Sequence, residues 1–94
     1  MEDDIIAAKL LLVLIVKRKW GESHTAYEHM TNHVRSDKTI AGRADKITNK
    51  IAGKLITRGL VLEKKTGYGL QVSLNPGLSK EIKLFIKNVL GKDV

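Results

Sequence analysis

The residues from 46 to 72 constrain the fold more than any other stretch, because the spacing of their apolar residues changes once, from helical to strand-like. Up to Gly59 apolar residues recur on one face of a helix: Ala44, Ile47, Ile51 and Leu55. After Gly59 apolar and polar residues alternate on both sides of the turn "KKTGYG", which predicts a β-hairpin. We therefore expect a helix over about 44–58, closed by Gly59, and a hairpin over about 60–75.

Three further helices are predicted from the rest of the chain. A nearly continuous apolar run predicts one over about 3–19, with acidic residues before it and basic residues after it, as the helix dipole favours. A second is expected over about 25–34, where Thr25 and Glu28 stand at the spacing of a capping box. An apolar stripe predicts the last helix over about 79–90.

The chain of 94 residues is expected to form a single domain, 1–94, without a linker or an internal repeat. Its predicted order is helix-helix-helix-strand-strand-helix, a mainly α fold of the α+β class with a small β-hairpin. The apolar run from Ile5 to Val16 is much shorter than the ~20 residues that a membrane span needs. We therefore expect no membrane partner and a cytoplasmic location. The absence of cysteine excludes disulfides and Cys-based metal sites.

The stretch "ITNKIAGKLITRGLVLEKKTGYGLQVSLNP" resembles the winged-helix (winged helix-turn-helix) family of DNA-binding domains. The resemblance implies that the helix over about 44–58 is a recognition helix that enters the major groove of DNA. It also implies that the hairpin over about 60–75 is a wing that reaches the backbone or the minor groove beside it. One feature departs from the family: the connection "RSDKTIAG" is longer than the three or four residues typical of a helix-turn-helix turn.

Basic residues are concentrated in the same part of the chain. The formal net charge is +7, and the segment 35–65 holds nine basic and three acidic residues, a surplus of six. Cations that neutralise phosphates release condensed counterions from DNA, which favours binding. We therefore expect double-stranded DNA as the partner, with the predicted helix and hairpin gripping one duplex.

Eight residues are the candidates for DNA contact: Arg43, Lys46, Asn49, Lys50, Lys54, Lys64, Lys65 and Tyr68. Asn49 carries a donor and an acceptor that match adenine, and the lysines suit phosphates or guanine. Tyr68 is placed to stack on a sugar or base, or to donate its hydroxyl to a phosphate. Alternatives without a role in DNA binding stay open: the lysines form a solvated helix face, and Tyr68 packs back on the hairpin. Gly53 either lets DNA come close or is simply a tolerated helical glycine.

No enzymatic or metal chemistry is indicated. His24, His29 and His33 cluster in the sequence, but a zinc site needs three or four well-placed ligands, and the H-E-x-x-H pattern is absent. The chain has no Ser-His-Asp spacing and no glycine-rich phosphate loop before a helix. We therefore expect no catalytic activity, no cofactor and no small-molecule substrate.

Three functions remain open. The leading hypothesis is a transcriptional regulator that binds double-stranded DNA sequence-specifically or semi-specifically. It is expected to be a homodimer, joined through the helices over about 3–19 and 79–90, in which two recognition helices lie about 34 Å apart. The first alternative is a factor for DNA replication, for plasmid or viral maintenance, or for chromatin packing. The second is a winged-helix module that binds another protein.

Overall fold

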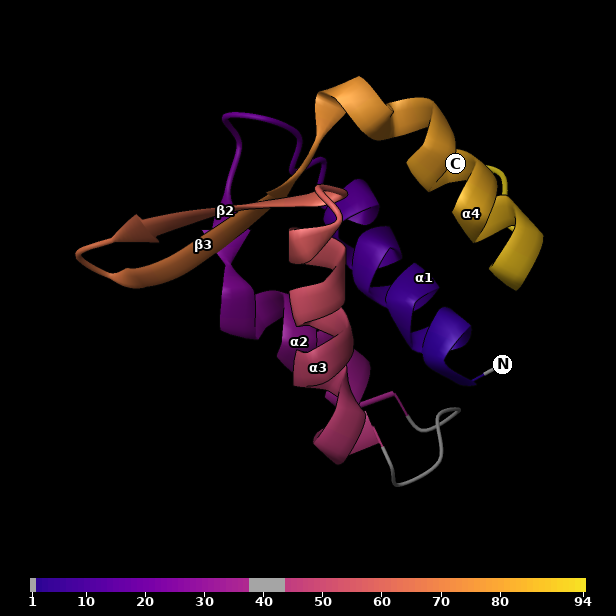
Figure 1. The fold of residues 1–94 in the computed structure, drawn as a ribbon, viewed down its shortest axis with the longest axis horizontal. Coiled ribbons are helices and arrows are strands. Elements are labelled where there is room, and N and C mark those ends of the chain that lie inside the picture. The colour runs from indigo at the N-terminus through magenta and orange to yellow at the C-terminus, as the bar shows by residue number, and fades with distance from the viewer. Residues whose placement is uncertain (1, 38–43) are drawn as a thin grey trace.

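The computed structural model describes residues 2–37 and 44–94, which form four α-helices and a three-stranded antiparallel sheet (Figure 1). The α+β class predicted from the sequence is confirmed. The elements in chain order are α1 (Glu2–Val16), β1 (Thr25–Ala26), α2 (Tyr27–Arg35), α3 (Ala44–Thr57), β2 (Val61–Thr66), β3 (Gly69–Leu74), the 3-10 helix η1 (Pro76–Leu78) and α4 (Ser79–Leu90). Most of the long connection expected between the second and third helices lies outside the described residues.

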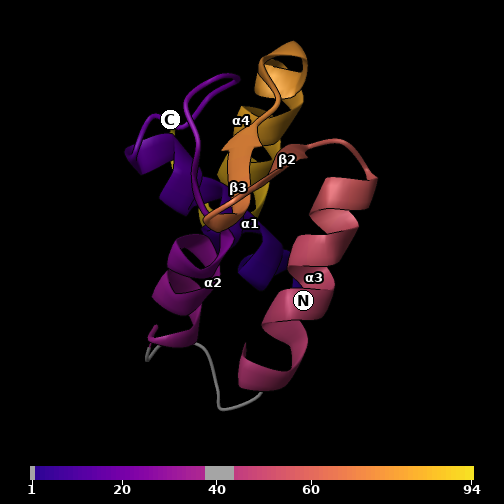
Figure 2. The same ribbon diagram turned by 90° about the vertical axis from the view of Figure 1, so that its left-hand side faces the viewer.

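Helix α1 is the centre of the packing, and it contacts α2, α3 and α4 (Figures 1 and 2). Its apolar residues point in all directions, and most are removed from solvent, including Ile6, Ala8, Leu10, Leu11 and Leu14, which are fully buried. One chain therefore buries most of the apolar residues of this helix by itself. Helix α4 covers the opposite side of α1 from α3, with Ile82 and Ile86 buried.

Helix α1 ends at Val16, three residues before the predicted end. The N–H of Lys19 donates to the carbonyl of Leu14 at 2.9 Å, and the N–H of Arg18 donates to that of Ile15 at 2.9 Å. This pair of bonds is a Schellman motif, in which one residue adopts the left-handed conformation. Here that residue is Arg18, with φ 56°. The predicted end at about residue 19 was therefore too late, because an arginine gives no signal in the sequence for a left-handed helix stop.

The sheet has the order β1-β3-β2. Strand β1 was not predicted, because Thr25 and Ala26 were assigned to the second helix; instead Thr25 pairs with Val72 of β3. The helix begins at Tyr27, its N-cap is Ala26, and the N-terminus has no side-chain cap. The capping box expected from Thr25 is therefore wrong, since the residue extends the sheet.

Helix α3 and the hairpin follow the predicted arrangement closely. The helix closes in a second Schellman motif, in which Leu60 N–H donates to Leu55 at 3.1 Å and Gly59 N–H donates to Ile56 at 3.0 Å. Gly59 has φ 80°, a conformation that glycine adopts without strain. Strands β2 and β3 then pair in register from Val61 opposite Leu74 to Thr66 opposite Gly69. The base of this hairpin is anchored in the core, and its tip projects from the body of the molecule (Figure 1).

Candidate nucleic-acid interface

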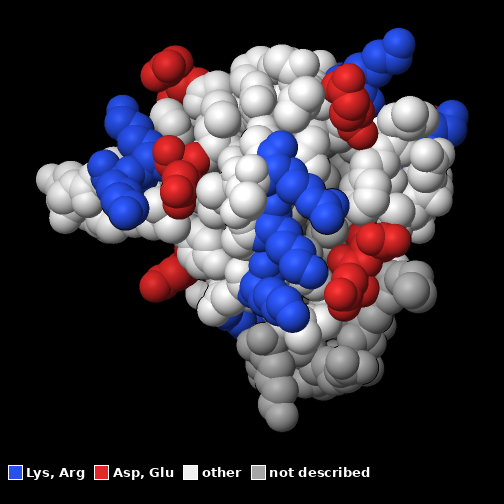
Figure 3. All heavy atoms as spheres, in the orientation of Figure 1, with Lys and Arg blue, Asp and Glu red and all other residues white. Residues whose placement is uncertain are grey.

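The outer face of α3 is basic and polar. Its inner face is fixed by buried residues: Thr48, Ile51, Ala52 and Leu55. Lys50, Lys54 and Arg58 are exposed and follow one another at intervals of four, so they form a row along one side of the helix. Within the described ranges, none of these three side chains has an acidic partner in an ion pair. Figure 3 shows a row of basic side chains over α3 on the face turned to the viewer.

The β2–β3 hairpin forms the second part of the candidate interface. Lys64 and Lys65 are both exposed, and as neighbours in a strand they point to opposite faces of the ribbon. Tyr68 at the tip is 99% exposed, so the alternative in which it packs back on the hairpin is wrong. The turn is held by Thr66, whose hydroxyl donates to the carbonyl of Gly69 at 2.9 Å and accepts from the N–H of Tyr68 at 3.2 Å.

The basic side chains of α3 and of the hairpin form two groups on the same face of the molecule, with neutral surface between them (Figure 3). An acidic side chain lies beside the hairpin group in this view, and Glu63, which precedes Lys64 in β2, is exposed. The basic residues of the predicted helix and hairpin therefore form two separate groups and not one continuous surface. A single duplex would have to bridge them.

Asn49 makes contacts that the sequence did not indicate. Its side-chain oxygen accepts from Arg35 Nη2 at 2.6 Å and from the hydroxyl of Tyr27 at 3.2 Å, so α2 and α3 are tied together at the surface. Arg35 is oriented by Asn32, whose side-chain oxygen accepts from Nη1 at 3.1 Å. A bidentate contact of Asn49 with adenine needs both its oxygen and its amide group. Such a contact requires Arg35 and Tyr27 to release that oxygen.

The Tyr27 hydroxyl in this cluster has a perturbed pKa. Burial raises the pKa of Tyr27 above its usual value of 10.0, and the positive charge of Arg35 lowers it by a smaller amount. The phenol therefore stays protonated at neutral pH and remains a hydrogen-bond donor to Asn49. No spacing rule links these residues, because Tyr27 and Arg35 lie 22 and 14 positions before Asn49.

Two of the predicted contact residues cannot be placed. Arg43 lies outside the described residues, and Lys46 belongs to α3 but its side chain is not described. Both stay predictions. The others are all exposed, on α3 or on the hairpin, as the candidate site requires: Asn49, Lys50, Lys54, Lys64, Lys65 and Tyr68.

The remaining surface of the described chain offers little other chemistry. Across residues 2–37 and 44–94, no three His, Asp or Glu side chains come together as ligands for a metal ion. None of the helices in these ranges is long and apolar enough to cross a membrane. Comparison of the chain with protein-family models, with curated proteins and with solved structures finds no match. Its function is therefore inferred from its own geometry.

Proposed function

We propose that this chain is a winged-helix protein that binds double-stranded DNA, with α3 as the recognition helix and the β2–β3 hairpin as the wing. The order of elements supports this proposal, since three helices are followed by a hairpin and a last helix. A role in transcriptional regulation is the leading form of the proposal. The partner in every form of it is a polyanion.

The observation that carries the proposal is the row of Lys50, Lys54 and Arg58. The row extends for about 12 Å along the helix axis, at ~1.5 Å per residue. The backbone of one DNA strand carries a charge every ~3.4 Å of axis, so a row of this length faces three or four phosphates. The major groove is about 12 Å wide, enough to admit a helix with its side chains.

Gly53, one turn before Thr57 on the exposed side of α3, gives independent support. A glycine inside a helix is about 0.8–1.0 kcal/mol less favourable than alanine. A Cβ at Gly53 would meet no atom within 4 Å, so nothing in the described part of the chain requires a missing side chain here. The close approach of a DNA backbone is a requirement that would explain this residue.

The hairpin also has a structure that folding alone does not explain. Every residue from 62 to 69 is exposed, so the outer part of the ribbon buries little apolar surface. A two-stranded ribbon without a covered face is marginal in water, because ordering the backbone costs free energy that burial does not offset. A contact of Lys64, Lys65 and Tyr68 with DNA would stabilise it.

A salt-dependent DNA titration tests the proposal. Five to seven phosphate contacts predict a slope of about −5 to −6 in a plot of log affinity against log salt concentration. The double variant Lys50→Gln/Lys54→Gln should weaken binding and reduce the slope by about 2. The matched control is Lys80→Gln/Lys83→Gln, two exposed lysines of α4, which should leave both quantities unchanged. Equal loss in both double variants would show that the chain binds DNA only through its net charge.

Two further measurements distinguish a transcriptional regulator from the alternative functions. A nuclease footprint that protects one short site indicates a regulator, and uniform protection indicates a packing or maintenance factor. A flat salt slope, or no DNA binding at about 100 mM salt, would favour a protein partner instead. Homodimerisation stays a prediction that sedimentation can test. Most apolar residues of α1 give it no support, since they are buried within one chain; Val16, which is 73% exposed, is the main exception.

A further inference from the structure

A cavity of about 540 Å³ opens between α1, the end of α2 and the segment after α4. No residue of α3 or of the hairpin lines it, so it is separate from the candidate DNA interface. Its volume lies within the ~300–1,000 Å³ of typical small-molecule sites. Its apolar wall is made of Leu12, Val13, Val16, Val34 and Leu90. The cavity is therefore suited in size and lining to an amphipathic small molecule.

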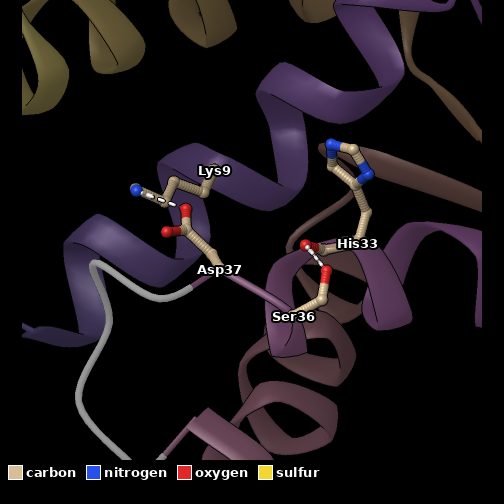
Figure 4. Close-up of polar contacts among 4 residues, drawn as sticks. All are labelled: Lys9, His33, Ser36 and Asp37. Carbon is tan, nitrogen blue, oxygen red and sulfur yellow. Dashed lines mark hydrogen bonds and ion pairs between the residues drawn. The ribbon is translucent and has the colours of Figure 1, made fainter.

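The charged residues around this cavity favour an anion. Lys9, Lys17 and Lys92 contribute three positive charges to the lining, and Asp37 is its one acidic residue among those described. Lys9 donates to the Asp37 carboxylate (Figure 4), and both side chains are partly buried. This ion pair is neutral as a unit. Lys17 and Lys92 are exposed and remain as two positive charges at the rim.

The ends of α1, α2 and α4 oppose this preference, because the C-terminus of a helix carries a partial negative charge and Leu90, the last residue of α4, also lines the cavity. Their last carbonyls, however, are largely occupied. Leu14 and Ile15 accept the bonds of the Schellman motif, and Ser36 Oγ donates to the backbone oxygen of His33 at 3.0 Å (Figure 4). The His33 ring points away from the Lys9–Asp37 pair in the same view. The two full charges of the rim lysines therefore outweigh the helix ends.

The apolar wall also leaves surface to be covered. Val16 is 73% exposed, more than any other large aliphatic residue in the described chain, and it lines the cavity beside Lys17. Covering exposed aliphatic surface is favourable in proportion to the area removed from water. An apolar chain ending in an anionic group would satisfy both features at once.

We propose that this cavity binds a small monocarboxylate with an apolar chain, with the chain against Val13, Val16 and Leu90 and the carboxylate between Lys17 and Lys92. Carboxylates accept short, charge-assisted hydrogen bonds from lysine. The proposal does not depend on DNA binding, because the two sites share no residue.

The test uses decanoate, kept below its micelle-forming concentration, as the probe. Titration followed by methyl NMR should give one saturable site, with shifts at Val13, Val34 and Leu90. The double variant Lys17→Gln/Lys92→Gln removes both charge-assisted hydrogen bonds and should bind at least about tenfold more weakly, since one such bond alone is worth about that much. Both lysines are exposed, so the variant should fold normally. The matched control Lys50→Gln/Lys54→Gln, on α3, should bind decanoate as the wild type does.

Several results would overturn the proposal. Decyltrimethylammonium binding as tightly as decanoate would show that the apolar wall acts without regard to charge. Unchanged affinity in the Lys17/Lys92 variant, shifts confined to other residues, or no saturation at millimolar decanoate would each do the same. A second copy of the chain is the competing occupant. Three results together would show that the cavity is a subunit contact. The wild type would sediment as a dimer, the Val16→Asp variant would sediment as a monomer, and decanoate would cause no shift in either protein.

Discussion

Replacing each of two glycines by alanine should change stability in opposite directions. In both Gly53 and Gly59 a Cβ would meet no atom within 4 Å, so neither substitution creates a clash. Gly53 lies inside α3, where alanine is favoured over glycine by about 0.8–1.0 kcal/mol. Gly59 has φ 80°, where a side chain costs roughly 1–2 kcal/mol. Gly53→Ala should therefore stabilise the chain, and Gly59→Ala should destabilise it.

Thermal unfolding followed by circular dichroism measures both effects. One kcal/mol shifts the midpoint by about 4–8 °C in a domain of this size, so the two variants should differ by roughly 10 °C or more. Urea unfolding gives the free energies directly, and unchanged m-values would show that the comparison is clean. If Gly59→Ala were as stable as the wild type, the left-handed closure of α3 would be refuted.

The same Gly53→Ala variant tests the DNA proposal. A more stable protein should bind at least as well as the wild type unless the added methyl group meets the ligand. We therefore expect a higher free energy of unfolding together with weaker DNA binding. Loss of structure cannot produce this combination. If the variant is stabilised and its DNA affinity is unchanged, the close approach of DNA at Gly53 is wrong. The row of basic residues would then have to support the proposal without it.

Four further predictions concern single residues. The pKa of Tyr27 is raised in the folded chain, so its phenol should hold its proton more strongly there than in the unfolded chain. Stability should therefore fall as the pH rises through 10. Urea unfolding should show a smaller loss of stability over this pH range in Tyr27→Phe. Arg35→Gln should raise the Tyr27 pKa further in an ultraviolet titration, since the charge of Arg35 lowers it. Arg18→Gly should stabilise the chain by about 1 kcal/mol in the same unfolding assay, because Arg18 occupies a left-handed position. Tyr68→Ala should change stability by less than ~0.5 kcal/mol but weaken DNA binding, as a fluorescence anisotropy titration would show.

The parts of the fold that local signals determine were predicted well. The change of apolar spacing at Gly59 located α3 and the hairpin, because helix periodicity, a left-handed glycine and strand alternation all agree there. Strand β1 carries no such signal. Two residues are too few to show alternation, and Thr25 and Ala26 become a strand only because β3 lies beside them. The end of α1 was also predicted wrongly because of a missing local signal, since an arginine such as Arg18 does not indicate a left-handed backbone conformation.

The candidate site shows the same division. Exposure of the basic residues followed from the amphipathic pattern, because the buried face of α3 fixes where its other side chains point. The contacts of Asn49 did not follow from it. They depend on how α2 packs against α3, which brings Tyr27 and Arg35 to the same place. A residue proposed from its chemistry to read a base thus has partners within the chain that the sequence could not indicate.

The charge of α3 opposes the stability of the helix that carries it. Lys50 and Lys54 stand four residues apart, as do Lys54 and Arg58, and like charges at this spacing destabilise a helix by about 0.2–0.5 kcal/mol per pair. No ion pair within the described residues offsets this repulsion. Neutralising these side chains should therefore leave stability unchanged or slightly increase it. If it lowered stability instead, the row would have a structural role. If neutralisation removed only polyanion binding, the role of the row would be to bind the polyanion, whose negative charge offsets the repulsion between the basic side chains.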